Sequence, residues 1–118
     1  MGIDIYLCDH KCDKDSEIDN ACRQQRAYIR ESYHGGTHYP SEQLLPESFN
    51  YYDVKVTYEQ LKQRLPDTIK EAILRAQLTY NMDAIDEIQK LIEPYFDFVH
   101  EVAQIESEGK EAWVTNSY

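Results

Sequence analysis

The first residues of the chain alternate between apolar and polar side chains. Ile3, Ile5 and Leu7 are apolar, and the positions between them are more polar. A period of two predicts a half-buried β-strand, because successive side chains of a strand point to opposite faces. The next residues, 9–20, are dense in Asp, Lys and Ser. They predict a solvated loop or a short polar helix.

The middle of the chain has weaker patterns. Residues 26–33 fit either a strand or a short helix, and residues 49–56 predict a second extended piece. Between them, the paired glycines at positions 35 and 36 predict a turn, because glycine tolerates positive φ and weakens regular elements. Ser41 is a candidate cap for one helical turn that follows.

Helical spacing dominates the rest of the chain. Thr57 and Gln60 form the pattern of a capping box and predict a helix start. Pro66 predicts either the end of that short helix or the start of the next, so a further helix is expected over residues 67–80. Apolar residues then recur at spacings of three and four from Ile85 to Ile105. This stripe predicts the longest helix of the chain.

Pro94 affects the interior of this long helix and Gly109 affects its end, and a strand follows it. Pro94 predicts a kink or break near Ile92, and Gly109 is a natural C-terminal cap. Residues 112–115 predict a last strand beside the first one. The sequence therefore predicts a single α+β domain over residues 1–118. A small sheet of N-terminal, middle and C-terminal strands is covered on one face by two to three C-terminal helices.

Charge narrows the classes of function. The chain has 22 acidic and 12 basic residues, for a net charge of −10. Such a protein repels nucleic-acid phosphates over most of its surface, so we expect no nucleic-acid partner. No apolar run is long enough to span a bilayer, and the N-terminus lacks signal-peptide features, so no membrane partner is expected. Three cysteines fit a reducing compartment, and we expect the cytoplasm of a bacterium or of a phage-infected host.

One short basic segment stands out from this acidic background. Arginine suits phosphate through its planar fork of donors, glycines let backbone N–H groups approach an anion, and Tyr or His rings stack on a base. The pattern indicates an anion or nucleotide site. The alternative is a glycine turn that joins two elements. The candidate ligand-binding residues are Arg30, Tyr33, His34, Gly35, Gly36, Thr37, His38 and Tyr39.

The same segment carries a resemblance to a family. Residues 1–6 read Met-Gly-Ile-Asp-Ile-Tyr, residues 28–36 end in Tyr-His-Gly-Gly, and residues 44–49 and 61–66 match as well. The chain resembles a family of small uncharacterised proteins of bacteria and phages that begin with such a strand and carry an Arg-Glu-x-Tyr-His-Gly segment. The resemblance implies that this segment belongs to a shared design. It implies no activity, and residues 8–22 lie outside it.

The sequence also contains candidate residues for three other functions. Cys8, His10, Cys12 and Cys22 are weak zinc candidates, because only one cysteine pair has a zinc-like spacing, and free thiols are the simpler interpretation. His34 and His38 are candidate acid–base groups of a small phosphodiesterase or hydrolase, although no motif fixes their geometry. An acidic helical face is a candidate decoy that imitates DNA phosphates or plugs a basic site on another protein. Its members are Glu87, Glu93, Asp97, Glu101, Glu106, Glu108 and Glu111.

The leading hypothesis is a non-catalytic binding protein for a small anionic ligand of nucleotide type, such as a cyclic nucleotide. A phage would use such a protein to sequester an immune signal of its host. In this hypothesis Arg30 holds phosphate, and Gly35 and Gly36 supply backbone donors. A homo-oligomer is expected, because two copies would enclose a ligand better than one small domain. No cofactor is expected, and the alternatives are the acidic inhibitor and the small hydrolase.

Overall fold

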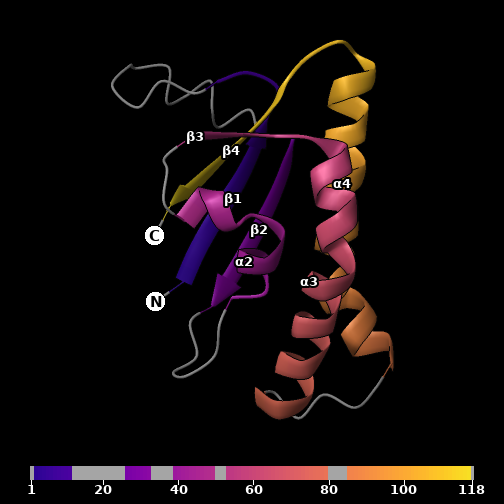
Figure 1. Cartoon of the computed structure of the whole chain (residues 1–118). Coiled ribbons are helices and arrows are strands. Elements are labelled where there is room, and N and C mark those ends of the chain that lie inside the picture. The colour runs from indigo at the N-terminus through magenta and orange to yellow at the C-terminus, as the bar shows by residue number, and fades with distance from the viewer. Residues whose placement is uncertain (1, 12–25, 33–38, 50–52, 80–84, 118) are drawn as a thin grey trace.

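A computed structural model describes residues 2–11, 26–32, 39–49, 53–79 and 85–117. Within these ranges the chain forms a four-stranded sheet, two long helices and two short helical turns (Figure 1). The elements, in chain order, are β1 (Gly2–Cys8), β2 (Ala27–Ser32), α2 (Ser41–Leu44), the 3₁₀ turn η1 (Pro46–Phe49), β3 (Asp53–Val56), α3 (Tyr58–Thr79), α4 (Ile85–Ser107) and β4 (Ala112–Ser117).

The sheet is antiparallel, with the strand order β2-β1-β4-β3. The N-terminal strand β1 is central, and Asp4 lies opposite Arg30 of β2 while Leu7 lies opposite Val114 of β4. The predicted pairing of the first and last strands is therefore confirmed. Strand β2 lies at an edge of the sheet, and α4 packs across it (Figure 1). The predicted α+β architecture, with helices covering one face of the sheet, is confirmed.

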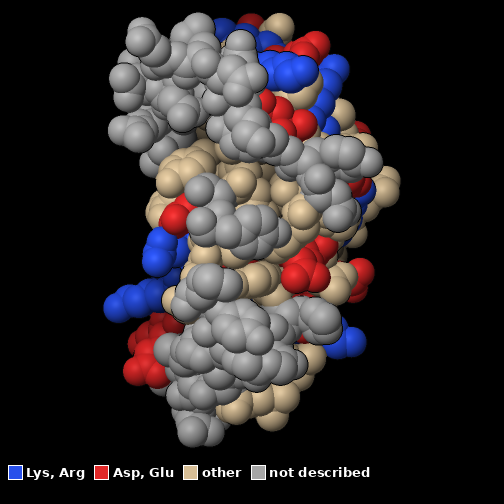
Figure 2. Space-filling view, turned by 90° about the vertical axis from the view of Figure 1, so that its left-hand side faces the viewer, with Lys and Arg blue, Asp and Glu red and all other residues tan. Residues whose placement is uncertain are grey.

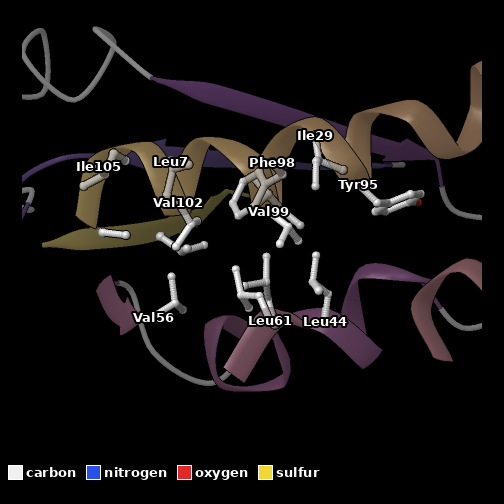
Figure 3. Close-up of a cluster of buried hydrophobic side chains, with 14 of the residues drawn as sticks. Leu7, Ile29, Leu44, Val56, Leu61, Tyr95, Phe98, Val99, Val102 and Ile105 are labelled. Carbon is white, nitrogen blue, oxygen red and sulfur yellow. The ribbon is translucent and has the colours of Figure 1, made fainter. Parts of the chain in front are cut away.

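The core lies between the sheet and the helices. Ile3, Ile5 and Leu7 on β1 are fully buried, as their alternation predicts. Opposite them, α4 places Phe98 and Val102 in the same apolar cluster (Figure 3). Each fully buried side chain of this kind contributes roughly 1.5–3 kcal/mol relative to an exposed one. Burial of this apolar layer therefore fixes the position of α4 over the strands.

Two predicted helix caps are present. The Gln60 backbone N–H donates to Thr57 Oγ1 at 3.3 Å, and the Thr57 N–H donates to Gln60 Oε1 at 3.2 Å, which is the reciprocal capping box. Gly109 has a φ of +76°, and the Lys110 N–H donates to the Ile105 carbonyl at 3.1 Å. This left-handed cap ends α4 and turns the chain back into β4.

Several local predictions were wrong. Helix α3 continues through Pro66, and α4 continues through Pro94, so neither proline ends a helix and the alternative of a break near Ile92 is wrong. An interior proline costs a helix about 3 kcal/mol, and packing of the same apolar stripe on both sides of each proline offsets that cost. Ser41 does not cap α2, because Pro40 occupies the cap position. In the predicted extended piece over residues 49–56, Phe49 belongs to η1 and Asp53–Val56 is a strand, while residues 50–52 lie outside the described residues.

An ion-pair cluster lies where β1, β2 and the end of α4 meet. The Arg26 guanidinium contacts Asp9 at 3.1 Å, Glu101 at 2.8 Å and Glu108 at 2.5 Å, and Lys110 contacts Asp9 at 3.3 Å. Hydrogen bonding with His10, followed by contacts to Lys110 and Arg26, lowers the pKa of Asp9 from 3.8 to about 2. The cluster joins the sheet to the C-terminal turn of α4.

Replacement of the central core side chain should separate packing from surface effects. We expect Phe98→Ala to lower the free energy of unfolding by about 3–5 kcal/mol, because it leaves a cavity in the apolar layer. Phe96→Ala is the matched control on the same helix, since Phe96 is 49% exposed, and should cost less than about 1 kcal/mol. Urea denaturation measures both. Equal losses in the two variants would contradict the assigned core.

The Asp9 contacts predict a loss of stability in acid. The pKa of Asp9 is lower in the folded chain, so its stabilising contribution is complete above pH 3.8 and is lost as the pH falls toward about 2. Asp9→Asn should therefore flatten the dependence of the unfolding free energy on pH within that window. Thermal unfolding followed between pH 5 and 2 checks this result. If the slope of the unfolding free energy against pH is the same in Asp9→Asn, Asp9 is not the cause of the loss of stability in acid.

Candidate functional site

The structure describes two of the eight candidate ligand residues. Tyr33, His34, Gly35, Gly36, Thr37 and His38 lie outside the described residues. Arg30 is on β2, and its guanidinium donates to Asp4 at 2.7 Å across the strand pair. The carboxylate of Asp4 therefore balances the charge of Arg30. The proposed role of Arg30 as the phosphate holder loses support from this contact.

Tyr39 contacts a second arginine, Arg75 of α3. The Arg75 guanidinium of α3 lies over the Tyr39 ring, 5.7 Å from its centroid. The ring of Phe49 lies 6.1 Å from that of Tyr39, so Tyr39 is packed between the two side chains. A cation over an aromatic face is stabilised by the ring quadrupole. Tyr39 therefore helps to position Arg75, a residue that the sequence analysis did not select.

A buried carboxylate, Glu31, connects the elements around Arg75. Glu31 on β2 is 6% exposed and shares the inward face of the strand with Ile29. It accepts hydrogen bonds from the Ser41 backbone N–H at 3.1 Å, from Ser41 Oγ at 2.5 Å and from the Tyr95 hydroxyl. Figure 3 shows Tyr95 at one end of the core cluster, with its hydroxyl pointing away from the apolar side chains. Glu31 thus joins β2 to α2 and α4.

The protonation of Glu31 reflects opposing effects. Burial raises the pKa of its carboxyl above the usual 4.5, while hydrogen bonds from Ser41 and Tyr95 and the charge of Arg75 act in the other direction. Its three partner groups all offer a hydrogen, which is the arrangement that a carboxylate requires. These donors and the charge of Arg75 therefore oppose the effect of burial on the pKa of Glu31.

The Glu31–Ser41 contact also joins two residues that stand on either side of residues 33–38 in the sequence. Glu31 precedes residues 33–38, and Ser41 follows them. Their hydrogen bonds join the end of β2 to the start of α2 across ten positions of the sequence. The two ends of the segment are therefore held together beside Arg75.

A pocket of about 220 Å³ lies between β2, α3 and α4, next to this contact. Its walls are apolar on several sides and charged on others. Arg75 enters it from α3, and Lys90, Pro94 and Tyr95 line it from α4. The described lining residues are Ile29, Arg30, Glu31, Ser32, Pro40, Ala72, Arg75, Lys90, Leu91, Pro94 and Tyr95. Of the candidate ligand residues, Arg30 lines this pocket, and the α3 and α4 walls hold no residue that the sequence analysis selected as a ligand residue.

One hydrogen-bond donor of the Arg75 side chain has no partner among the described residues. Arg75 is 8% exposed, and its Nη2 donates to the Ser32 carbonyl at the edge of the sheet. Its Nε is buried and has no hydrogen-bond partner among the residues that the structure describes. A buried donor without a partner costs about 1–3 kcal/mol. One signal for Arg75 was present in the sequence, because it interrupts the stripe of small residues formed by Thr68, Ala72 and Ala76.

The described part of the chain holds no cluster of three or more metal-ligating side chains. Cys8 is fully buried in β1, and burial with the nearby Asp53 and Asp9 raises the pKa of its thiol from 9.0 to about 11. His10 contacts Asp9. Cys12 and Cys22 lie outside the described residues, as do His34 and His38 of the hydrolase alternative. The zinc and hydrolase hypotheses gain no support from the described geometry.

The candidate acidic face is partly used inside the molecule. Glu101 and Glu108 pair with Arg26, Glu106 accepts the N–H of Tyr58 at 2.8 Å, and Glu111 contacts Lys55 at 3.3 Å. On the face shown in Figure 2, basic and acidic side chains form small groups near one another. Neither observation favours the decoy hypothesis.

The Tyr95–Glu31 contact can be tested against an exposed counterpart. Tyr95→Phe removes a buried donor to a carboxylate and should cost about 1.5–3 kcal/mol of unfolding free energy. Tyr28→Phe is the control, because the Tyr28 hydroxyl also donates to a carboxylate, Asp4, but the residue is 40% exposed. It should cost less than about 1 kcal/mol. Denaturant unfolding measures both, and equal costs would argue against the central role of Glu31.

Among the described residues, no helix is long and apolar enough to cross a membrane. Comparison of the chain with protein-family models, curated proteins and solved structures gives no match. Within the described part of the chain, the pocket lined by Arg75, Lys90 and Glu31 is the feature that supports a function.

Proposed function

We propose that this protein binds a small anionic ligand without changing it chemically, and that the ligand lies in the pocket between β2, α3 and α4. The carrying observation is Arg75, a guanidinium on α3 that is 8% exposed and lines the pocket. An anion in the pocket would interact with its positive charge. Since desolvation strengthens a charged hydrogen bond, a buried arginine is an effective anchor for an acid group.

Lys90 supports this assignment from the rim. Its side chain is exposed and lines the same pocket from α4. The protein carries a net charge of −10, so two cations that line one small hollow form a local exception. Such a site would attract an anion that the rest of the surface repels.

The carboxyl and phenol groups of the pocket, Glu31 and Tyr95, are engaged with each other, which supports binding over catalysis. Glu31 accepts from Ser41 and Tyr95, and the Tyr95 hydroxyl is used in that contact. A general acid or base must reach the reacting atoms through its own hydrogen bond. The nucleotide and immune-signal parts of the hypothesis rest on residues 33–38 and stay predictions, as does the homo-oligomer.

Ligand screening with a charge variant tests the proposal. The purified protein is screened by thermal shift against small carboxylates, inorganic phosphate, and cyclic and linear nucleotides. A ligand at 100 times its dissociation constant contributes about 2.7 kcal/mol and should raise the melting temperature by several degrees. Lys90→Gln should weaken binding about two- to five-fold, because it removes an exposed charge at the rim.

The control is Lys70→Gln, an exposed lysine on α3 that does not line the pocket, and it should leave the affinity unchanged. Ligand recovered after heat denaturation should be chemically intact. Recovery of a product would identify a hydrolase instead. The proposal fails if no anion shifts the melting temperature, or if Lys70→Gln and Lys90→Gln weaken binding equally.

A further inference from the structure

One wall of the pocket is the free edge of the sheet. The residues of β2 that line it are Ile29, Arg30, Glu31 and Ser32, and the described lining includes no residue of β1. Side chains of consecutive strand residues alternate between the two faces, so a single space that touches all four residues runs along the side of the strand. Strand β2 is the last in the order β2-β1-β4-β3. The pocket therefore lies between the free edge of β2 and the helices α3 and α4 (Figure 1).

The backbone groups of β2 alternate in direction, and one close approach shows how. A Cβ added at Gly2 of β1 would lie 2.8 Å from the Glu31 carbonyl oxygen, so this carbonyl is directed toward β1. Hydrogen-bonding groups of successive residues in an antiparallel strand alternate between its two sides. The backbone N–H and carbonyl of Arg30 and Ser32 are therefore directed toward the free edge. The Ser32 carbonyl fits this assignment, because it accepts a hydrogen bond from Arg75 of α3.

Arg30 thus presents a backbone donor and a backbone acceptor at the edge that borders the pocket. The residue is exposed, and within the described part of the chain no strand pairs with β2 on this side. Its guanidinium is directed toward β1, because it contacts Asp4 at 2.7 Å. The edge of a sheet is a template on which an extended segment of another chain adds as a new strand.

The charges across the pocket indicate which part of an extended chain fits beside this edge. Arg75 and Lys90 line the pocket from α3 and α4. Glu31 lines it as well, but its carboxyl accepts hydrogen bonds from Ser41 and Tyr95 inside the fold. The C-terminal carboxylate is the anion that every unmodified peptide carries at the end of its main chain. A peptide end therefore combines the backbone groups that suit β2 with the charge that suits the two cations.

The size of the pocket limits how much of a peptide it holds. A volume of about 220 Å³ lies below the 300–1,000 Å³ that is usual for drug-sized ligands. Such a space accommodates the terminal residue, while the preceding residues continue along the strand. Ile29, Ala72 and Leu91 supply apolar surface, which suits an aliphatic side chain at the last position.

Resting on the proposed function, we infer that the anionic ligand is the C-terminal end of a peptide that adds to β2 as a fifth strand. Its main chain pairs with the backbone of Arg30, and its terminal carboxylate faces the positive charges of Arg75 and Lys90. Its last side chain contacts Ile29 and Leu91. The net charge of −10 favours peptides whose preceding residues are uncharged or basic.

Calorimetry with a short peptide and its derivatives tests the ligand class. The reference is acetyl-Lys-Thr-Val-Thr-Val with a free carboxylate. Its C-terminal amide should bind at least about ten-fold more weakly, because it lacks the charge that the two cations attract. N-methylation of successive peptide amides should weaken binding about 2- to 13-fold at alternate positions only, since alternate N–H groups of a strand face its neighbour. Isovalerate, an acid without a peptide main chain, should bind at least about ten-fold more weakly than the reference.

Two variants at one position test the backbone donor of β2. Arg30→Pro and Arg30→Ala lose the same side chain, and only the proline variant also loses the N–H. Because this N–H is directed away from β1, its loss removes no hydrogen bond between β1 and β2. Arg30→Pro should therefore bind the reference peptide about 2- to 13-fold more weakly than Arg30→Ala. In the unaltered protein, the reference peptide should slow hydrogen exchange at the Arg30 amide.

The outcomes separate this inference from the function on which it rests. Isovalerate or a nucleotide that binds as tightly as the reference peptide, and depends on Lys90, would overturn the peptide assignment and leave anion binding standing. Equal effects of N-methylation at every position, or unchanged exchange at the Arg30 amide, would overturn strand addition. A dimer in sedimentation that protects this amide and binds no peptide would place a second copy at the edge and also overturn the inference. Absence of binding by every peptide, acid and nucleotide would overturn both proposals.

Discussion

A carboxylate stays in a protein interior only where its neighbours replace the hydrogen bonds and the countercharge of water. Glu31 meets this condition through Ser41, Tyr95 and the charge of Arg75. These partners come from α2, α4 and α3, while Glu31 itself is on β2. The single carboxylate therefore joins α2 and α4 to the edge of the sheet near the charge of Arg75 on α3, and the pocket lies where these elements meet.

This arrangement ties stability to the proposed function. Arg75 is held by the Ser32 carbonyl and the ring of Tyr39, so its guanidinium has a fixed position before any ligand arrives. A prepositioned donor binds with a smaller loss of conformational freedom than a mobile surface arginine. This position leaves the buried Arg75 Nε without a hydrogen-bond partner among the described residues, which lowers stability. Functional sites often retain such unsatisfied polar groups.

The sequence predicted the fold better than the site. Strand alternation at Ile3, Ile5 and Leu7, the Thr57 capping box and the Gly109 cap are local signals, and the structure confirms all three. The continuity of α3 and α4 through Pro66 and Pro94 was missed, because tertiary packing rather than local preference decides it. Periodicity cannot report how far packing compensates for a lost backbone hydrogen bond.

The surroundings of the candidate residues were predicted less well for a related reason. Arg30 lines the pocket and Tyr39 contacts Arg75, yet strand register pairs Arg30 with Asp4, a contact between residues 26 positions apart. Arg75 and Lys90 lie on two helices and approach β2 only through the fold. Their proximity depends on long-range geometry, about which a single sequence carries little information.

The hydrogen bonds between Glu31 and Ser41 have a consequence for how this protein can change over time. They hold the end of β2 and the start of α2 at a fixed separation. The two positions are therefore coupled in evolution, because loss of either side chain leaves the other buried without its hydrogen-bond partner.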